Sequence, residues 1–174
     1  DEFLDINSSY GYFQTGEWRA WDFNFGVPAV MNVNDARDER AFIYKWQVAG
    51  VFQFLPPTEG NARLVSVLWG LASIVTMFWA GYFYTRKKSI GLIAAVLFAV
   101  SISGIIFDRR LRMYAMFFPL YLAFATTLFA FFESSYQGKR QWLRKVSDQY
   151  GINLWYLVPL IIFAVLSALV HGLA

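Results

Sequence analysis

The chain has 174 residues, of which 57% are hydrophobic and 20% aromatic, and only 16% are charged. A soluble domain carries about a quarter charged residues, so this composition argues against one. The absence of cysteine excludes a disulfide framework, a thiolate metal site and a cysteine nucleophile. Because the formal net charge is a mild +3, the placement of the charges is more informative than their sum.

The first predicted element is a helix that ends near Gly16. Its apolar residues recur at three- and four-residue intervals, at Phe3, Ile6, Tyr10 and Phe13, and so form one stripe. Glycine is a common signal for the end of a helix. The opening stretch "DEFLD" places acidic residues in the first turn, where each complements the helix dipole by about 0.3–1 kcal/mol.

A loop and a second helix follow. The stretch "WRAWDFNFGVP", residues 18–28, contains a glycine and a proline and predicts a loop. The stretch "ERAFIYKWQVAGVFQFL", residues 39–55, is apolar and aromatic. Its tyrosine, tryptophan and lysine suit an interfacial helix at the level of the lipid headgroups. The alternation over residues 44–48 leaves a short strand as the alternative.

Four apolar segments come next, each long enough to cross a bilayer. A bilayer core about 30 Å thick needs about 17–25 helical residues. Helices buried in a soluble protein would keep a polar face, which these segments lack. The sequence thus predicts an all-α integral membrane protein, with residues 1–63 as an external loop and residues 64–174 as the spans, in one membrane domain. The predicted spans are about 64–84, 90–107, 111–132 and 154–173.

Basic residues predict the orientation. The loop "TRKKS" holds Arg86, Lys87 and Lys88, and residues 133–153 hold four more basic residues. Both connections lie on the same side of the spans, so the positive-inside rule makes that side cytoplasmic. Residues 1–63, which are mostly acidic in their charge, then lie outside, as does the turn 108–112.

We expect the chain to be part of a longer protein. It begins at Asp1 with neither a methionine nor a signal peptide, although residues 1–63 must reach the outside. An upstream transmembrane helix would anchor this segment, and further helices are expected downstream.

The outer side gathers acids and arginines. Asp1 and Glu2 open the external loop, and the stretch "FDRRLRMYAM" places Arg109, Arg110 and Arg112 within four positions. Sugar transfer from a lipid phosphate needs a base for the acceptor hydroxyl, and a carboxylate can serve. It also needs cations for the leaving phosphate, which arginine contacts in a bidentate manner. Snorkelling to lipid headgroups in general is the alternative for Arg109 and Arg110.

The order of several stretches resembles a known enzyme family. These stretches are the acidic pair that opens an external helix, "TGEW", "ERAFIYKWQVAGVF", "NARLVSVLWGLASIVTMFWAGYFY", "RLRMYAMFF" and finally "LVHGLA". Together they are similar to the N-terminal membrane module of the GT-C glycosyltransferases that use polyprenyl-phosphate sugars, such as relatives of protein O-mannosyltransferases and aminoarabinose transferases. The resemblance covers nearly the whole chain and implies a GT-C-like polytopic helical bundle.

The resemblance also implies roles for named residues. The family carries a catalytic acid in its first external loop, at the place where Asp1 and Glu2 stand. Arg63 matches an arginine that opens the second helix, and Arg112 and Tyr114 match an Arg-x-Tyr that opens the fourth. The residues expected at the donor phosphate are Arg63, Arg109, Arg110, Arg112, Tyr114 and His171.

Two points stay open within the resemblance. Several relatives carry a Lys-Pro-Pro or similar stretch before the interfacial helix, where this chain has "DERAFIY". The acceptor and the cofactor are therefore open, and a divalent metal is one option. His171 matches a histidine near the outer end of the family's fifth helix, but a hydrated interfacial side chain is the alternative.

These observations lead to one function and one rival. We expect a multi-pass enzyme of the cell membrane, active on the non-cytoplasmic face, that transfers a sugar from a polyprenyl-phosphate donor to a lipid, glycan or protein. The resemblance implies inversion and the role of Asp1 as base. Membrane lipid is an expected partner, and nucleic acid is not.

The rival is a non-catalytic membrane protein, such as a transporter segment or an inactive assembly partner. A transporter would show polar or broken positions near the middle of the membrane. The mid-span regions hold few polar residues, which favours the enzyme. These residues are Ser73, Thr76, Ser101, Thr126 and Thr127.

The predicted topology can be tested with single cysteines, since the chain has none of its own. We expect an impermeant thiol reagent on intact cells to label a cysteine at Thr58, and to leave those at Lys87 and Gln141 unlabelled until the membrane is opened. Labelling at position 87 in intact cells would overturn the model.

Overall fold

The computed structural model describes residues 2–18, 21–22, 27–28, 41–109 and 113–171. The described part is almost entirely helical, as predicted. Its elements are α1 (Glu2–Thr15), β1 (Trp21–Asp22), β2 (Val27–Pro28), α2 (Phe42–Phe54), α3 (Glu59–Thr85), α4 (Lys88–Ala99), α5 (Ile102–Arg109), α6 (Tyr114–Glu133), α7 (Gln141–Tyr150), the short 3₁₀ helix η1 (Leu154–Tyr156) and α8 (Leu157–His171).

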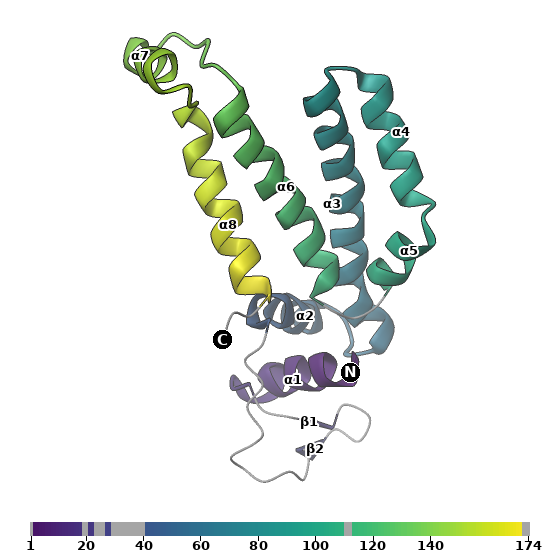
Figure 1. Ribbon diagram of the computed structural model, residues 1–174. Coiled ribbons are helices and arrows are strands. Elements are labelled where there is room, and N and C mark those ends of the chain that lie inside the picture. Colours follow the sequence, from purple (N-terminus) through teal and green to yellow (C-terminus); the bar gives the residue numbers. More distant parts are fainter. Residues whose placement is uncertain (1, 19–20, 23–26, 29–40, 110–112, 172–174) are drawn as a thin grey trace.

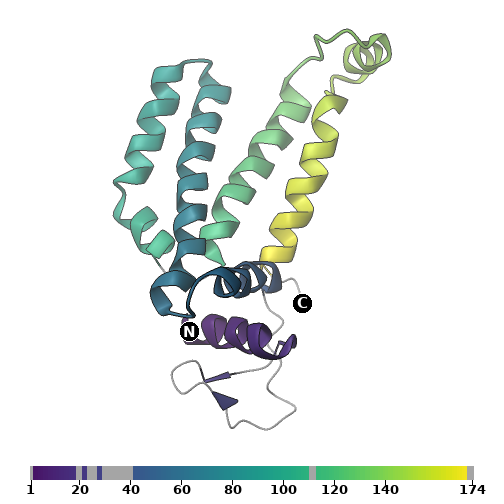
Figure 2. The same ribbon diagram turned by 180° about the vertical axis from the view of Figure 1, so that it is seen from behind.

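Two helical hairpins and a crossing layer make up the fold (Figure 1). The helices α3 and α4 form one hairpin, α6 and α8 form the other, and α3 packs against α6. The α1–α2 layer lies across one end of both hairpins, which we call the α1–α2 end. Helix α7 and the turn between α3 and α4 lie at the opposite end, the α7 end, as Figure 2 shows from behind.

Both predicted helices of the N-terminal segment are present. Helix α1 ends at Thr15, and Gly16 follows with a φ of 74°, a left-handed conformation that glycine adopts without strain. Residues 44–48 are helical within α2, so the strand alternative is wrong. The predicted loop 18–28 contains the antiparallel pair β1–β2. Two-residue strands are too short to produce an alternating pattern.

Two helices are long and apolar enough to cross a membrane. They are α3, with 27 residues, and α6, with 20, and they match the predicted spans 64–84 and 111–132. The segment of η1 and α8 takes the place of the predicted span 154–173. It is long and apolar enough to cross a membrane only together with α7, from which it is bent by 108°. The described helices therefore suit a membrane protein with two spans, or three if the bent pair counts as one.

The predicted span 90–107 is not one helix, and this prediction was wrong. Helix α4 ends at Ala99 after 12 residues, a rise of about 18 Å, and α5 begins at Ile102. The hydroxyl of Ser101 accepts the Gly104 N–H at 3.0 Å, so this serine caps α5 and does not continue α4. Neither piece alone can cross a core about 30 Å thick.

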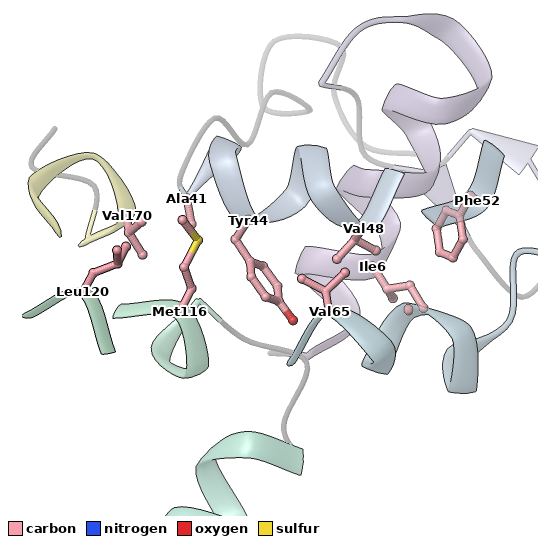
Figure 3. Packing of buried hydrophobic residues seen from close by; sticks show 10 residues of the cluster. Ile6, Ala41, Tyr44, Val48, Phe52, Val65, Met116, Leu120 and Val170 are labelled. Atoms are coloured by element: carbon pink, nitrogen blue, oxygen red, sulfur yellow. The ribbon is translucent and has the colours of Figure 1, made fainter. Parts of the chain in front are cut away.

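The buried core lies where α2 crosses the ends of the longer helices (Figure 3). Side chains from α1, α2, α3, α6 and α8 meet there, so this cluster holds the layer and both hairpins together. Its members include Ile6, Ala41, Tyr44, Val48, Phe52, Val65, Met116, Leu120 and Val170.

The α3–α4 hairpin packs closely through two glycines. A Cβ atom on Gly91 would lie 2.6 Å from the Phe78 carbonyl oxygen and 3.1 Å from the Tyr82 nitrogen. A Cβ atom on Gly81 would lie 2.9 Å from the Cα of Gly91. Because these neighbours are backbone atoms, they cannot rotate aside as a flexible side chain would. The close approach of α3 and α4 therefore requires glycine at both positions.

Gly91→Ala should push α4 away from α3 and lower the free energy of unfolding by about 1–3 kcal/mol. Gly60→Ala is the matched control, because a Cβ atom there meets nothing within 4 Å. Thermal unfolding in detergent, followed by tryptophan fluorescence, compares the two variants. Equal midpoints would contradict the packing described here.

Candidate functional site

The fold brings the elements of the predicted donor site to one end. Arg63 lies in the second turn of α3, and Tyr114 is the first residue of α6. Arg109 ends α5 and His171 ends α8. The helix ends that carry these positions lie at the α1–α2 end, as does α1, which begins at Glu2 (Figures 1 and 2).

Part of the predicted site lies outside the described residues. This holds for Asp1, Arg110 and Arg112. Of Glu2, Arg109 and His171, only the helical backbone is described. Contacts between the acidic pair and the arginines therefore stay predictions.

Arg63 forms an ion pair within its own helix. Its guanidinium contacts the carboxylate of Glu59, and the two side chains are 41% and 61% exposed. An exposed pair of this kind is worth about 0.2–1 kcal/mol. Tyr114 is also exposed, which suits an interfacial tyrosine.

A buried ion pair that the sequence does not predict joins α1 to α2. The Nζ of Lys45 lies 3.7 Å from the Oδ1 of Asp5, and the side chains are 0% and 15% exposed. Burying an ammonium group removes its hydration, a cost that a nearby carboxylate offsets. The sequence alone assigns Lys45 to the headgroup layer and Asp5 to the helix dipole. The structure corrects the assignment of Lys45, which is buried, and adds a partner for Asp5 in the first turn of α1.

The sequence points to one member of this pair, Lys45, but not to its partner. Lys45 is the one charged residue of α2 and lies beside the apolar stripe of Tyr44, Val48 and Phe52. A lone charge at the edge of an apolar face is a candidate for burial with a partner. No feature of the sequence points from Lys45 to Asp5, because the crossing of α1 over α2 is a tertiary contact.

Two hydrogen bonds fix α2 on α3. The hydroxyl oxygens of Tyr44 and Ser66 are 2.6 Å apart, and both side chains are buried. The indole N–H of Trp69 donates to the Gln47 side-chain oxygen at 2.8 Å. Hydrogen bonds in a low-dielectric interior are directional and specify one arrangement. The position of α1 is thus set by α2, through Lys45, and that of α2 by α3.

An open groove of about 630 Å³ runs beside α1 and α2. Aromatic rings and glutamine amides line it, but none of the residues predicted for the site do. Along α1, Tyr12 is about 15 Å from Glu2, so the groove lies away from the acidic pair. The lining residues are Tyr12, Phe13, Gly16, Trp46, Gln47, Ala49, Gly50, Val51, Gln53 and Phe54.

The cofactor stays open. Within the described part of the chain, no three histidine, aspartate or glutamate side chains are grouped so that they could hold a metal ion. Asp1, one member of the acidic pair, lies outside the described residues.

Comparison with known proteins returned no match to a family model, a curated protein or a solved structure. The candidate site therefore rests on the residues and on their placement in the fold.

Asp5→Asn and Lys45→Met should destabilise the fold unequally. Asp5→Asn leaves the fully buried ammonium of Lys45 without this carboxylate, at an expected cost of about 3–5 kcal/mol. Lys45→Met leaves the carboxylate at the edge of solvent and should cost less, about 1–3 kcal/mol. Chemical unfolding in detergent measures both.

The double variant and one further variant make this test specific. Asp5→Asn with Lys45→Met should be more stable than Asp5→Asn alone, because the buried charge is gone. Glu59→Gln is the control, since it removes an exposed pair worth less than about 1 kcal/mol. A double variant no more stable than Asp5→Asn would contradict the role of the pair.

Proposed function

We propose that this chain forms the membrane module of a glycosyltransferase that uses a polyprenyl-phosphate sugar. The fold would be a GT-C-type polytopic bundle in the cell membrane. The sugar would pass to an acceptor on the non-cytoplasmic side, at the surface that the α1–α2 layer covers. The acceptor would be a lipid, a glycan or a protein.

One observation supports the proposal most strongly. The helix ends that carry Arg63, Arg109, Tyr114 and His171 share one end of the fold with α1, which begins beside the acidic pair (Figure 1). The basic loop 86–88 and α7 lie at the other end. Under the positive-inside rule the α7 end faces the cytoplasm, so the candidate site faces outward.

In this proposal Asp1 is the general base, and Glu2 assists it or orients the acceptor. Asp1 would take a proton from the acceptor hydroxyl while that oxygen attacks the anomeric carbon on the face opposite the phosphate. The bond from sugar to phosphate oxygen then breaks, and the product has inverted configuration. A divalent metal bound near the acidic pair stays an open option.

The arginines would bind the phosphate of the donor. The donor is a phosphodiester with one negative charge, and departure of the sugar leaves a monoester that carries more. Cations that contact this phosphate therefore stabilise the transition state more than the bound donor. Arg112 comes shortly before α6 in the sequence and would contact the phosphate, and Arg63, with Arg109 or Arg110, would complete the contacts.

The polar residues in the middle of the helices give little support to the alternative function, a transporter. Four of the five hydroxyl groups donate a hydrogen bond to a backbone carbonyl of their own helix, and so have a partner within that helix. The bonds run from Ser73 to Trp69, Thr76 to Ala72, Thr126 to Leu122 and Thr127 to Ala123. Ser101, the remaining one, caps α5.

Asp1→Asn in the full-length protein should lower turnover by about 10²–10⁴-fold and leave expression unchanged. The enzyme in proteoliposomes is given polyprenyl-phosphate hexoses and pentoses with membrane extract as acceptor source, and release of polyprenyl phosphate is measured.

Asp148→Asn is the matched control, because Asp148 is an exposed acid in α7 at the opposite end. It should keep the normal rate. A near-normal rate for Asp1→Asn would exclude Asp1 as the general base, and would leave the acidic pair only its favourable interaction with the helix dipole. Failure of the unmodified protein to release polyprenyl phosphate from any donor would count against the proposed function itself.

A further inference from the structure

Helix α7 has a cleanly divided surface. At 100° per residue, Trp142, Val146 and Tyr150 lie along one face, while Arg144 and Lys145 lie on the opposite half. Leu143 and Ser147 are buried against the rest of the protein, but Trp142 and Tyr150 are 58% and 65% exposed. An apolar stripe with exposed tryptophan and tyrosine is therefore left without cover by the described residues.

The corner between α7 and α8 sets the direction of α7. Gly151 ends α7 with a φ of 66°, and Asn153 is buried. The Asn153 side chain accepts the Trp155 N–H at 3.2 Å and donates to the Ser134 hydroxyl at 2.9 Å, while its backbone N–H donates to the Phe131 carbonyl at 2.7 Å. These bonds hold the bend of 108° between the two helices.

This corner would lie at the membrane surface. The segment from Leu154 to His171 rises about 27 Å, close to the thickness of a bilayer core. If α8 crosses the membrane, Trp155 at its beginning lies in the interfacial layer, where it is 56% exposed. A helix bent by about a right angle from α8 then runs along the surface.

The charges around α7 indicate the kind of lipid. Lys139, Arg140, Arg144 and Lys145 are all exposed, and they outnumber the exposed acids Asp148 in α7 and Glu133 at the end of α6. The basic loop 86–88 lies at the same end (Figure 1). Exposed basic side chains beside an interfacial apolar stripe match a surface that carries negative phosphate groups over acyl chains.

We propose that α7 is an interfacial helix that binds the anionic phospholipid surface at the α7 end. Trp142, Val146 and Tyr150 enter the boundary between headgroups and acyl chains. Lys139, Arg140, Arg144 and Lys145 contact the lipid phosphates around it. This role is independent of the proposed glycosyl transfer, because it concerns the opposite end of the fold.

The absence of native cysteine permits a direct test. Single cysteines at 142, 146 and 150, and at 141, 145 and 148 on the polar half, receive a nitroxide label in the full chain. The protein is placed in nanodiscs of phosphatidylcholine with about a third phosphatidylglycerol. Since a nanodisc exposes both leaflets, the result does not depend on orientation.

We expect the first three labels to be accessible to oxygen and shielded from a water-soluble nickel complex, and the other three to show the reverse. A period of three to four residues in this ratio would support the interfacial helix. Equal access of the nickel complex to all six labels would place α7 in water and overturn the proposal.

A second comparison tests the lipid charge. In discs of phosphatidylcholine alone, and in anionic discs with Lys139, Arg140, Arg144 and Lys145 all changed to glutamine, the labels at 142 and 146 should move toward water. Lys139→Arg with Lys145→Arg keeps the charge and should keep the depth. The same depth under all of these conditions would overturn the claim that anionic lipid is recognised.

Discussion

One short helix determines how the rest of the fold is arranged. Helix α2 contacts α1, α3 and α8, and Gln47 reaches the sulfur of Met116 in α6. Because α2 is enclosed by these helices, the charged side chain of Lys45 is buried and needs a nearby negative charge. Asp5 supplies that charge from α1. The same ion pair thereby couples α1 to the bundle.

The long helices follow the packing of membrane proteins. Their buried positions are mostly small, which lets helix backbones approach closely, while large aliphatic side chains point outward. Leu68 on α3 and Leu97 on α4 are 63% and 62% exposed. In water such surface would favour aggregation, whereas a bilayer covers it. The small buried residues are Gly70, Ser73 and Ala80 in α3, Gly91 and Ala95 in α4, and Ala115, Ala123 and Ala130 in α6.

The two ends of the fold use cations in different ways. At the α1–α2 end, Arg63 forms an exposed ion pair with Glu59 on its own helix. At the α7 end, Arg144 and Lys145 lie on α7, and Lys139 and Arg140 come just before it, a spread that would suit many headgroups and no single one. The donor site proposed at the α1–α2 end and the lipid-binding surface proposed at the α7 end would therefore place their cations differently.

The sequence alone determined most of the helices and showed that the longest are apolar enough to cross a membrane. Both properties follow from the spacing of apolar residues and the length of each apolar segment, which can be read from neighbouring positions in the chain. The sequence placed α1 and its end at Gly16, the helix α2 and the long helices α3 and α6. It failed at Ser101, where one side-chain hydrogen bond to Gly104 divides a segment that hydrophobicity alone joins. Only the tertiary structure decided that Lys45 is buried against Asp5, that Tyr44 meets Ser66 and that α7 turns away from α8. These contacts depend on how helices cross, and local periodicity carries no information about a partner distant in the chain.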